Sequence, residues 1–448
     1  MRKYETDLTE GNVTKQLLSF ATPFFLAQIL QACYSMADML IAGRFMGDYG
    51  ISAIINSSVC IMLITMLVNG FALSGTVLVA QHVGAKQPEN AKKTISTLFT
   101  VFIYCAVAIT ILGILFTNKI IVMLNTPQEA VTQARNYLRI CFGGTIFICG
   151  YNAVSAVLRG LGDSKRPLYF VAVATGVNVV LDLIFVGVLG WGAGGAAFAT
   201  ILAQALSFGL AVRTLYKNNF LFDFKLKSFV IYKDKLKMIL KIGLPSAIQS
   251  TVINFSMLFV LTAINGYGLA ASTAAGIGAK IDSFAILPTI AVSQSVASMS
   301  GQNLGAGRID RTKETVFAGV KISLSFGVII YLFVNLCGIK IVDIFNCSPQ
   351  TVEVALMYIK YVSVFYIANS VMFVINGLAA GSGNAIFALG NAVLSVIIVR
   401  IPLIYIFQNF MGLGLRGVFM AMGLAQYAGL VTAGLFYISG KWKKSLVK

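Results

Sequence analysis

The sequence predicts an all-α polytopic membrane protein with twelve transmembrane helices in two six-helix bundles, related by pseudo-two-fold symmetry along the membrane normal. Three observations predict this fold. First, the 448-residue chain has a mean hydropathy of +0.84 and only 11% charged residues, whereas soluble proteins carry about 25%. Second, the apolar runs are about 20 to 27 residues long, and about 20 residues cross a bilayer as a helix. Third, the two halves of the chain repeat each other.

Length and apolar composition predict twelve spans, and no run of short alternating strands suggests a transmembrane β-barrel. The predicted spans are residues 16–41, 51–80, 94–116, 131–157, 168–188, 193–216, 238–264, 272–299, 315–337, 355–377, 386–407 and 414–438. The polar N-terminal segment does not resemble a cleaved signal peptide.

Positive charge alternates between the predicted loops. Twenty-four Lys and Arg residues fall in the tails and in the loops on one side, against seven on the other side. The positive-inside rule therefore places both termini in the cytoplasm. The net charge of +18 follows from this topology and does not indicate a nucleic-acid partner. The seven cysteines lack metal-ligand spacing, so we interpret them as small core residues.

The chain is an internal duplication. The matched pairs are Gln81 and Gln302, Gly84 and Gly305, Ala85 and Ala306, and Tyr137 and Tyr358 at an offset of 221, and Pro23 and Pro245, Gly195 and Gly417, and Gln204 and Gln426 at 222. Each half has six spans, and an even number of spans returns the chain to the side of the membrane on which it began. The two halves therefore have the same orientation in the membrane and are parallel repeats. The expected parts are an N-terminal lobe (1–216), a basic cytoplasmic linker (217–237) and a C-terminal lobe (238–448), with a cleft between or within the bundles.

Two acids stand out because they lie inside apolar spans. Asp38 and Asp182 fall in the first and fifth spans, and an ionisable residue at membrane depth marks an ion or substrate pathway by default. The second half has no counterpart acids, and Arg400 falls where Asn178 would. The predicted ionisable site therefore belongs to the first half alone.

Polar residues at helical spacing accompany these acids. They form three stripes, which are Gln28, Gln31, Tyr34 and Asp38; Thr175, Asn178 and Asp182; and Thr200, Gln204 and Ser207. Because lipid does not solvate polar faces, the stripes are expected to face one another. Their carboxylate, amide and hydroxyl oxygens suit a proton or a small hard cation such as Na⁺. The predicted coupling residues are Asp38, Asp182, Asn178, Thr200 and Tyr34.

Other assignments remain open from the residues alone. The acids could instead be structural and hydrogen-bonded inside the bundle, and hydroxyls commonly link helices. Pro23 is either a hinge or a fixed kink. The candidate substrate-cavity residues are Gln31, Asn152, Thr175 and Gln204.

Enzymatic chemistry has little support. His82 is the one histidine, and it lacks a partner nucleophile, so a catalytic set is not indicated. Asp282 and Lys280 point to different faces of one helix, which favours a structural role for them. The glycine-rich stretches lack the context of a phosphate-binding loop. We expect no enzyme activity, no cofactor, and no metal site beyond Na⁺ at the coupling residues.

Four stretches carry a family resemblance: YSMADMLIAGRFMG, LRGLGDSKRP, NVVLDLIFV and GQNLGAGRIDRTKET. With the two-times-six architecture, they make the whole chain resemble the multidrug and toxic compound extrusion (MATE) family, in its prokaryotic DinF-like or MepA-like branch. The resemblance implies a secondary active antiporter that exports amphiphilic, often cationic drug-like compounds in exchange for H⁺ or Na⁺. It implies a monomer in the cytoplasmic (inner) membrane of a prokaryote.

The resemblance also implies roles for particular residues. Relatives of this branch use a helix 1 acid, an Asn-xxx-Asp in helix 5 and a helix 6 threonine, which correspond to Asp38, Asn178, Asp182 and Thr200. Relatives of the NorM type carry acids in helices 7 and 10, which here (238–264 and 355–377) have none. The alternative is a lipid-linked oligosaccharide flippase of a related fold, which predicts a charged central cavity and additional helices.

Overall fold

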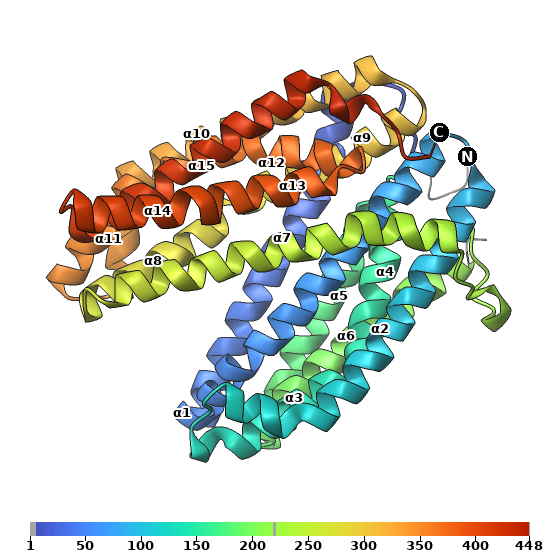
Figure 1. Cartoon of the computed structure of the whole chain (residues 1–448). Helices are drawn as coiled ribbons and strands as arrows, with labels where there is room; N and C mark the ends of the chain where they lie inside the picture. The colour runs from blue at the N-terminus through green and yellow to red at the C-terminus, as the bar shows by residue number, and fades with distance from the viewer. Residues whose placement is uncertain (1–5, 218–220, 448) are drawn as a thin grey trace. The chain divides into compact units, whose positions relative to one another are not determined.

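The computed structural model describes residues 6–217 and 221–447, apart from the side chain of Asp48. Arg2, Lys3 and Lys448, which contributed to the predicted topology, and residues 218–220 of the predicted linker lie outside this part. The regular elements of the described residues are all helical (Figure 1). The α-helices are α1 (Val13–Gly84), α2 (Pro88–Met123), α3 (Val131–Gly143), α4 (Thr145–Gly160), α5 (Lys165–Asp182), α6 (Gly192–Lys217), α7 (Lys233–Asn265), α8 (Leu269–Ala285), α9 (Leu287–Gly305), α10 (Ile309–Asp343), α11 (Pro349–Val362), α12 (Phe365–Gly381), α13 (Ala385–Ala392), α14 (Arg400–Tyr405) and α15 (Gly414–Ser439).

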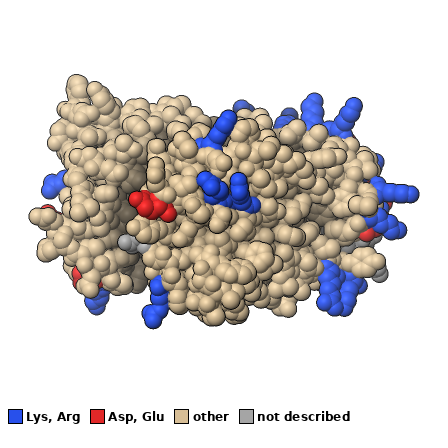
Figure 2. Space-filling model, turned by 90° about the horizontal axis from the view of Figure 1, so that it is seen from below, with Lys and Arg blue, Asp and Glu red and all other residues tan. Residues whose placement is uncertain are grey.

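The predicted set of twelve spans is confirmed. In the described residues, ten helical segments are long and apolar enough to cross a membrane, and two bent helix pairs complete the twelve. Large apolar side chains point outward, and Leu115, Leu336 and Phe410 are 71%, 83% and 89% exposed. Figure 2 shows that the face turned to the viewer is mostly uncharged, with Lys and Arg side chains in a few groups. Such a surface suits lipid contact.

The spans are less regular than the sequence predicted. The fourth and tenth spans are bent by 45° where α3 meets α4 and where α11 meets α12. π-Helical turns interrupt the fifth span at Leu183–Val188 and the eleventh at Val393–Val399 and Ile406–Phe410. The fourth and tenth spans correspond in the repeat, as do the fifth and eleventh. The bends and the π-helical turns at Leu183–Val188 and Ile406–Phe410 therefore belong to the repeated unit, whereas Val393–Val399 corresponds to an α-helical stretch of α5.

A glycine divides α1 into the first two spans. Gly47 has φ 61° and ψ −166°, a backbone conformation that residues with a Cβ atom rarely adopt. The two spans are Val13–Gly47 and Tyr49–Gly84. This break lies in the predicted gap between residues 41 and 51.

The described residues form two compact units that exchange short segments. Unit 1 contains Thr22–Gly243, and unit 2 contains Leu8–Ala21 together with Leu244–Lys448. The first turns of α1 thus belong to unit 2, and the first turns of α7 belong to unit 1. At the repeat offset of 222, residues 8–21 correspond to residues 230–243. The exchange is therefore reciprocal.

Polar contacts hold the exchanged segment in unit 2. The Arg311 guanidinium on α10 donates to the carbonyl oxygens of Leu8, Glu10 and Gly11 at 3.2, 2.8 and 2.7 Å. The Leu8 N–H donates to Oε1 of Gln302 at 3.0 Å, and the Leu8 side chain is buried in the core of unit 2. Gln302 is one of the residues that the repeat keeps, and here it has a structural role.

The matching segment in unit 1 is held by two hydroxyls of α2. Ser96 Oγ donates to the carbonyl oxygen of Ser228 at 2.6 Å and accepts from the Val230 N–H at 3.0 Å. The Tyr232 N–H donates to Thr97 Oγ1 at 3.1 Å. Each unit therefore binds the segment that precedes the other unit's first helix.

Proline follows both crossing points. Pro23 is the second residue after Ala21, and Pro245 is the second residue after Gly243. Both lie inside continuous helices. Proline has no N–H to donate to the preceding turn, so each helix lacks one backbone hydrogen bond close to where it passes between units.

Small residues allow close helix contacts within unit 2, where α9, α10 and α12 pack on one another. A Cβ built on Gly381 of α12 would lie 2.6 Å from the Ala297 carbonyl oxygen of α9. Real Cβ atoms do not approach so closely, so the two backbones must separate if this glycine is replaced.

We predict that Gly381→Ala destabilises the protein by about 1–3 kcal/mol, the range for overpacking of a well-packed interior. Gly434→Ala is the matched control, because its Cβ would meet nothing within 4 Å. Thermal melts of the purified variants would show a lower midpoint for Gly381→Ala only. Equal midpoints for both variants would contradict the close contact between α9 and α12.

Candidate functional site

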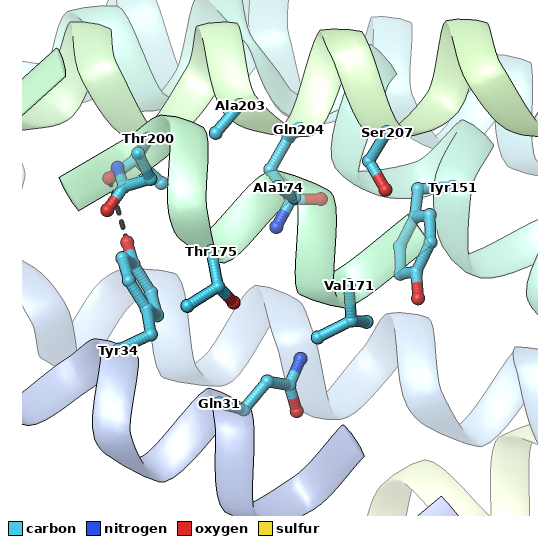
Figure 3. Close-up of a pocket in the computed structure, with 11 residues that line it drawn as sticks. Gln31, Tyr34, Tyr151, Val171, Ala174, Thr175, Thr200, Ala203, Gln204 and Ser207 are labelled. Atoms are coloured by element: carbon cyan, nitrogen blue, oxygen red, sulfur yellow. Dashed lines mark hydrogen bonds between the residues drawn. The ribbon is translucent and has the colours of Figure 1, made fainter. Parts of the chain in front are cut away.

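The predicted polar stripes meet inside unit 1. Tyr34 of α1 reaches α6, where its hydroxyl lies 2.9 Å from Thr200 Oγ1 in a hydrogen bond (Figure 3). Asn178 and Asp182 of α5 are buried, with exposed fractions of 2% and 1%. The predicted convergence of helices 1, 5 and 6 is therefore present in the structure.

Asn178 links α5 to both the acid and α6. With its amide nitrogen turned toward Asp182, it donates to Asp182 Oδ2 at 2.9 Å and accepts from the Thr200 N–H at 3.1 Å. The spacing of four residues places the amide and the carboxylate on one helix face. Asp182 is also the last residue of α5 before the π-helical turn Leu183–Val188, and such turns often occur at functional sites.

The two acids lie together. The carboxyl of Asp38 is within hydrogen-bonding reach of the carboxyl of Asp182. Two ionised carboxylates offer only acceptors, so neither can donate a hydrogen bond to the other. Oδ1 of Asp38 and Oδ1 of Asp182 are both buried and have no hydrogen-bond partner. The pair therefore has acceptor capacity that the described side chains leave unused.

A small cavity adjoins this cluster and opens onto Tyr34, Asn178 and Thr200. It measures about 50 Å³, which has room for a water molecule or a small ion and is far below the several hundred Å³ of a drug-sized site. The complete lining is Gln31, Tyr34, Tyr151, Val171, Ala174, Thr175, Asn178, Thr200, Ala203, Gln204 and Ser207. Gln204 Oε1 is buried without a partner.

The candidate substrate residues divide into two groups. Gln31, Thr175 and Gln204 line the cavity (Figure 3). Asn152 does not line it, and its amide donates to the Ile148 carbonyl oxygen one turn earlier at 2.8 Å. Asn152 was a candidate cavity residue, but an amide can also satisfy its own helix backbone.

Two tyrosines near the site were not among the predicted site residues. Tyr151 of α4 lines the cavity and donates to the Pro167 carbonyl oxygen at 3.4 Å. Tyr137 of α3 is buried and interacts electrostatically with Tyr34 and Asp38. The match of Tyr137 with Tyr358 was the available signal, but a residue present in both halves is more simply explained by packing.

Unit 2 places a carboxylate in a different setting. Asp282 of α8 accepts hydrogen bonds from the hydroxyls of Tyr358 and Tyr366, at 2.6 Å each. Both tyrosines are buried, with exposed fractions of 2% and 5%. Each carboxylate oxygen of Asp282 therefore has a protein donor, unlike Oδ1 of either acid in unit 1.

The comparisons with known proteins identify the family. A family model described as MatE matches residues 23–184 and 245–406. The chain belongs to the MatE family. The two matched ranges are related by the offset of 222 residues, which agrees with the internal duplication.

Relatives and a solved structure match nearly the whole chain. The probable multidrug resistance protein YpnP of Bacillus subtilis is 30% identical over 441 residues, which is 98% of this chain and 97% of the relative. The multidrug export protein MepA of Staphylococcus haemolyticus is 23% identical over 422 residues, 93% of this chain and 91% of the relative. A solved MOP superfamily transporter from Pyrococcus furiosus matches with a TM-score of 0.92 at 23% identity, covering 98% of this chain and all of that one. The predicted family and fold are confirmed.

We predict that a double-mutant cycle detects the bond between Tyr34 and Thr200. Tyr34→Phe and Thr200→Val each remove one hydroxyl, so the double variant should lose less stability than the sum of the two. The coupling should be about 0.6 kcal/mol, as for typical hydrogen bonds between membrane helices. Unfolding of the four proteins in mixed micelles measures it, and additive losses would mean that the two hydroxyls do not interact.

Proposed function

We propose that the protein is a secondary active multidrug efflux antiporter, which exports amphiphilic and cationic compounds in exchange for H⁺ or Na⁺. The observation that carries this proposal is the Asp38–Asp182 pair in unit 1, with one buried, unpartnered oxygen on each acid. The names of the relatives YpnP and MepA, a probable multidrug resistance protein and a multidrug export protein, support the substrate class.

The coupling step follows from the charge of the pair. Two neighbouring carboxylates at membrane depth are costly unless a proton or cation neutralises part of their charge. Binding of H⁺ or Na⁺ at the pair would stabilise contact between α1 and α5, and its loss would favour their separation. Asn178, Thr200 and Tyr34 would orient the acids and complete the oxygen shell. The membrane potential would supply about 2.3 kcal/mol per charge for each 100 mV.

Pro23 is the proposed hinge of this movement. It lies between the crossing point after Ala21 and the acid Asp38 on the same helix. Because α1 lacks a backbone hydrogen bond there, bending costs less than elsewhere in the helix. A shift of the Asp38 segment would thus leave the exchanged segment of residues 8–21 in place.

Topology and assembly are part of the same proposal. The distribution of Lys and Arg supports cytoplasmic termini, and the bacterial relatives support a cytoplasmic membrane location. A monomer suffices, since both acids and their oxygen ligands come from one unit of one chain. The cavity of about 50 Å³ is too small for drugs, so the substrate would require a wider conformation or a different place.

The flippase alternative has less support. It predicts helices beyond the twelve spans, whereas the described residues contain at most twelve by length and composition. The multidrug names of the relatives also favour export of drug-like compounds.

We predict that Asp38→Asn abolishes ion-driven export without impairing folding, because it removes one half of the carboxyl pair. Ethidium transport in proteoliposomes under an imposed pH or Na⁺ gradient measures the effect. Glu89→Gln, at an exposed position in the first turn of α2, is the control and should transport like the unaltered protein. Full transport by Asp38→Asn at equal insertion would remove this acid from the mechanism.

We also predict that Asp282→Asn reduces transport far less than Asp38→Asn but lowers stability. An asparagine amide has one acceptor oxygen, so one of the two tyrosine hydroxyls would lose its acceptor at a cost of about 1–3 kcal/mol. Transport per inserted molecule and thermal melts separate the two effects. Loss of transport equal to that of Asp38→Asn, with an unchanged melt, would place a coupling acid in unit 2.

A further inference from the structure

Unit 2 contains a buried positive charge that the proposed mechanism does not use. Arg400 begins α14 directly after the π-helical turn Val393–Val399 and is 5% exposed. Its Nη1 donates to Ser256 Oγ over a long 3.4 Å, and its Nε is buried without a hydrogen-bond partner. The Ser256 hydroxyl itself donates to the Val396 carbonyl oxygen at 2.7 Å, so it offers Arg400 a neutral acceptor only.

No carboxylate neutralises this guanidinium within the part of the chain that the structure describes. The ion pairs found there are Arg166–Asp163, Lys235–Asp234 and Lys313–Asp310. Tyr358 interacts electrostatically with Arg400, but the hydroxyl of Tyr358 is donated to Asp282.

An uncompensated buried charge is unfavourable by several kcal/mol. Proteins that retain a buried charge usually pair it or bind a ligand with it. The Nε of Arg400 is therefore a donor that an anionic ligand would satisfy.

The internal repeat places Arg400 at the counterpart of the unit 1 site. At the offset of 222 residues, Arg400 corresponds to Asn178 and Ser256 corresponds to Tyr34. Each of Asn178 and Arg400 lies ten residues before the end of its span, at Val188 and Phe410, about 15 Å at the helical rise of 1.5 Å per residue. The two positions thus share a depth in their helices.

The acids of unit 1 have apolar counterparts in unit 2. Val260 replaces Asp38 and Ile404 replaces Asp182, and both are almost fully buried, at 1% and 2% exposed. The same place in the repeat therefore carries two acids in one unit and a lone guanidinium in the other. The first suits a cation, and the second suits an anion.

We infer that Arg400 binds the carboxylate of zwitterionic substrates within unit 2. A guanidinium offers two parallel N–H donors to a planar carboxylate, and this bidentate pairing is stronger than a neutral hydrogen bond. The inference rests on the proposed export function and assigns to Arg400 the recognition of those exported compounds that carry a carboxylate. Compounds without a carboxylate would not use Arg400.

The test compares three substrates in proteoliposomes: a zwitterionic fluoroquinolone, its ethyl ester, which lacks the free carboxylate, and the cation ethidium. Arg400→Gln should lower fluoroquinolone transport at least about tenfold, because loss of one partner of a buried charge pair typically costs more than that factor. Transport of the ester and of ethidium should stay close to that of the unaltered protein. Arg400→Lys should be intermediate, since it keeps the charge and loses the planar fork.

Stability distinguishes a binding role from a structural one. Removing an uncompensated buried charge should leave the melting temperature of the ligand-free protein unchanged or higher. Equal loss of all three transport activities, together with a lower melting temperature, would assign Arg400 to structure and overturn the inference. Undiminished fluoroquinolone transport by Arg400→Gln would also overturn it.

A measurement on the unaltered protein keeps the inference testable if the variants fail to fold. The fluoroquinolone should raise the melting temperature more than its ethyl ester at equal concentration, because only the former carries the carboxylate. Equal stabilisation by the two compounds would contradict the inference. Failure of the unaltered protein to transport any of the three compounds under either gradient would instead contradict the proposed function.

Discussion

The contact between the carboxyls of Asp38 and Asp182 is the constraint on which the account of unit 1 depends. Two acids from separate helices meet inside an apolar bundle, and neither can donate a hydrogen bond to the other when both are ionised. The amide of Asn178 satisfies one oxygen of Asp182, and one buried oxygen of each acid remains without a partner. Two neighbouring carboxylates at membrane depth repel each other when both are ionised, and for this reason the proposed mechanism places a proton or cation at the pair.

The exchanged segments also bear on the helix movement that the proposed mechanism requires. The first turns of α1 belong to unit 2, while the same helix carries Asp38 in unit 1. In the proposed mechanism, a movement of Asp38 relative to residues 8–21 is absorbed within α1, at the backbone hydrogen bond that Pro23 cannot make. The reciprocal arrangement at Pro245 shows that the crossing and the proline belong to the repeat and not to the acid pair alone.

Much of this architecture was predictable from the sequence, because membranes impose strong rules on composition and spacing. Helix length, apolar composition and the repeat predicted all twelve spans. The 3–4 spacing of the stripes in helices 1, 5 and 6 brought together Tyr34, Asn178 and Thr200 correctly, since polar faces in a bundle have few other places to go. The family resemblance, which is confirmed, implied the same residues, and their roles stay a prediction.

Other features had no clear sequence signal. The bends in the fourth and tenth spans and the π-helical turns depend on packing between helices, which composition does not report. Asn152 has the residue type of a cavity lining but bonds to its own helix. The exchange of residues 8–21 depends on Arg311 and Gln302, which lie about 300 residues away in the sequence. The hydrogen bonds from Tyr358 and Tyr366 to Asp282 were also not predicted, because in sequence a tyrosine inside an apolar span looks like an ordinary core residue.

The most direct test of the central claim is ion counterflow driven by substrate. Proteoliposomes would be loaded with ethidium, without an initial pH or Na⁺ gradient, and the internal pH and Na⁺ would be recorded as the substrate moves. The account predicts counterflow of H⁺ or Na⁺ in the unaltered protein and none in Asp38→Asn or Asp182→Asn, with all three proteins equally inserted. Undiminished counterflow in both variants would show that the coupling ion does not bind at the carboxyl pair.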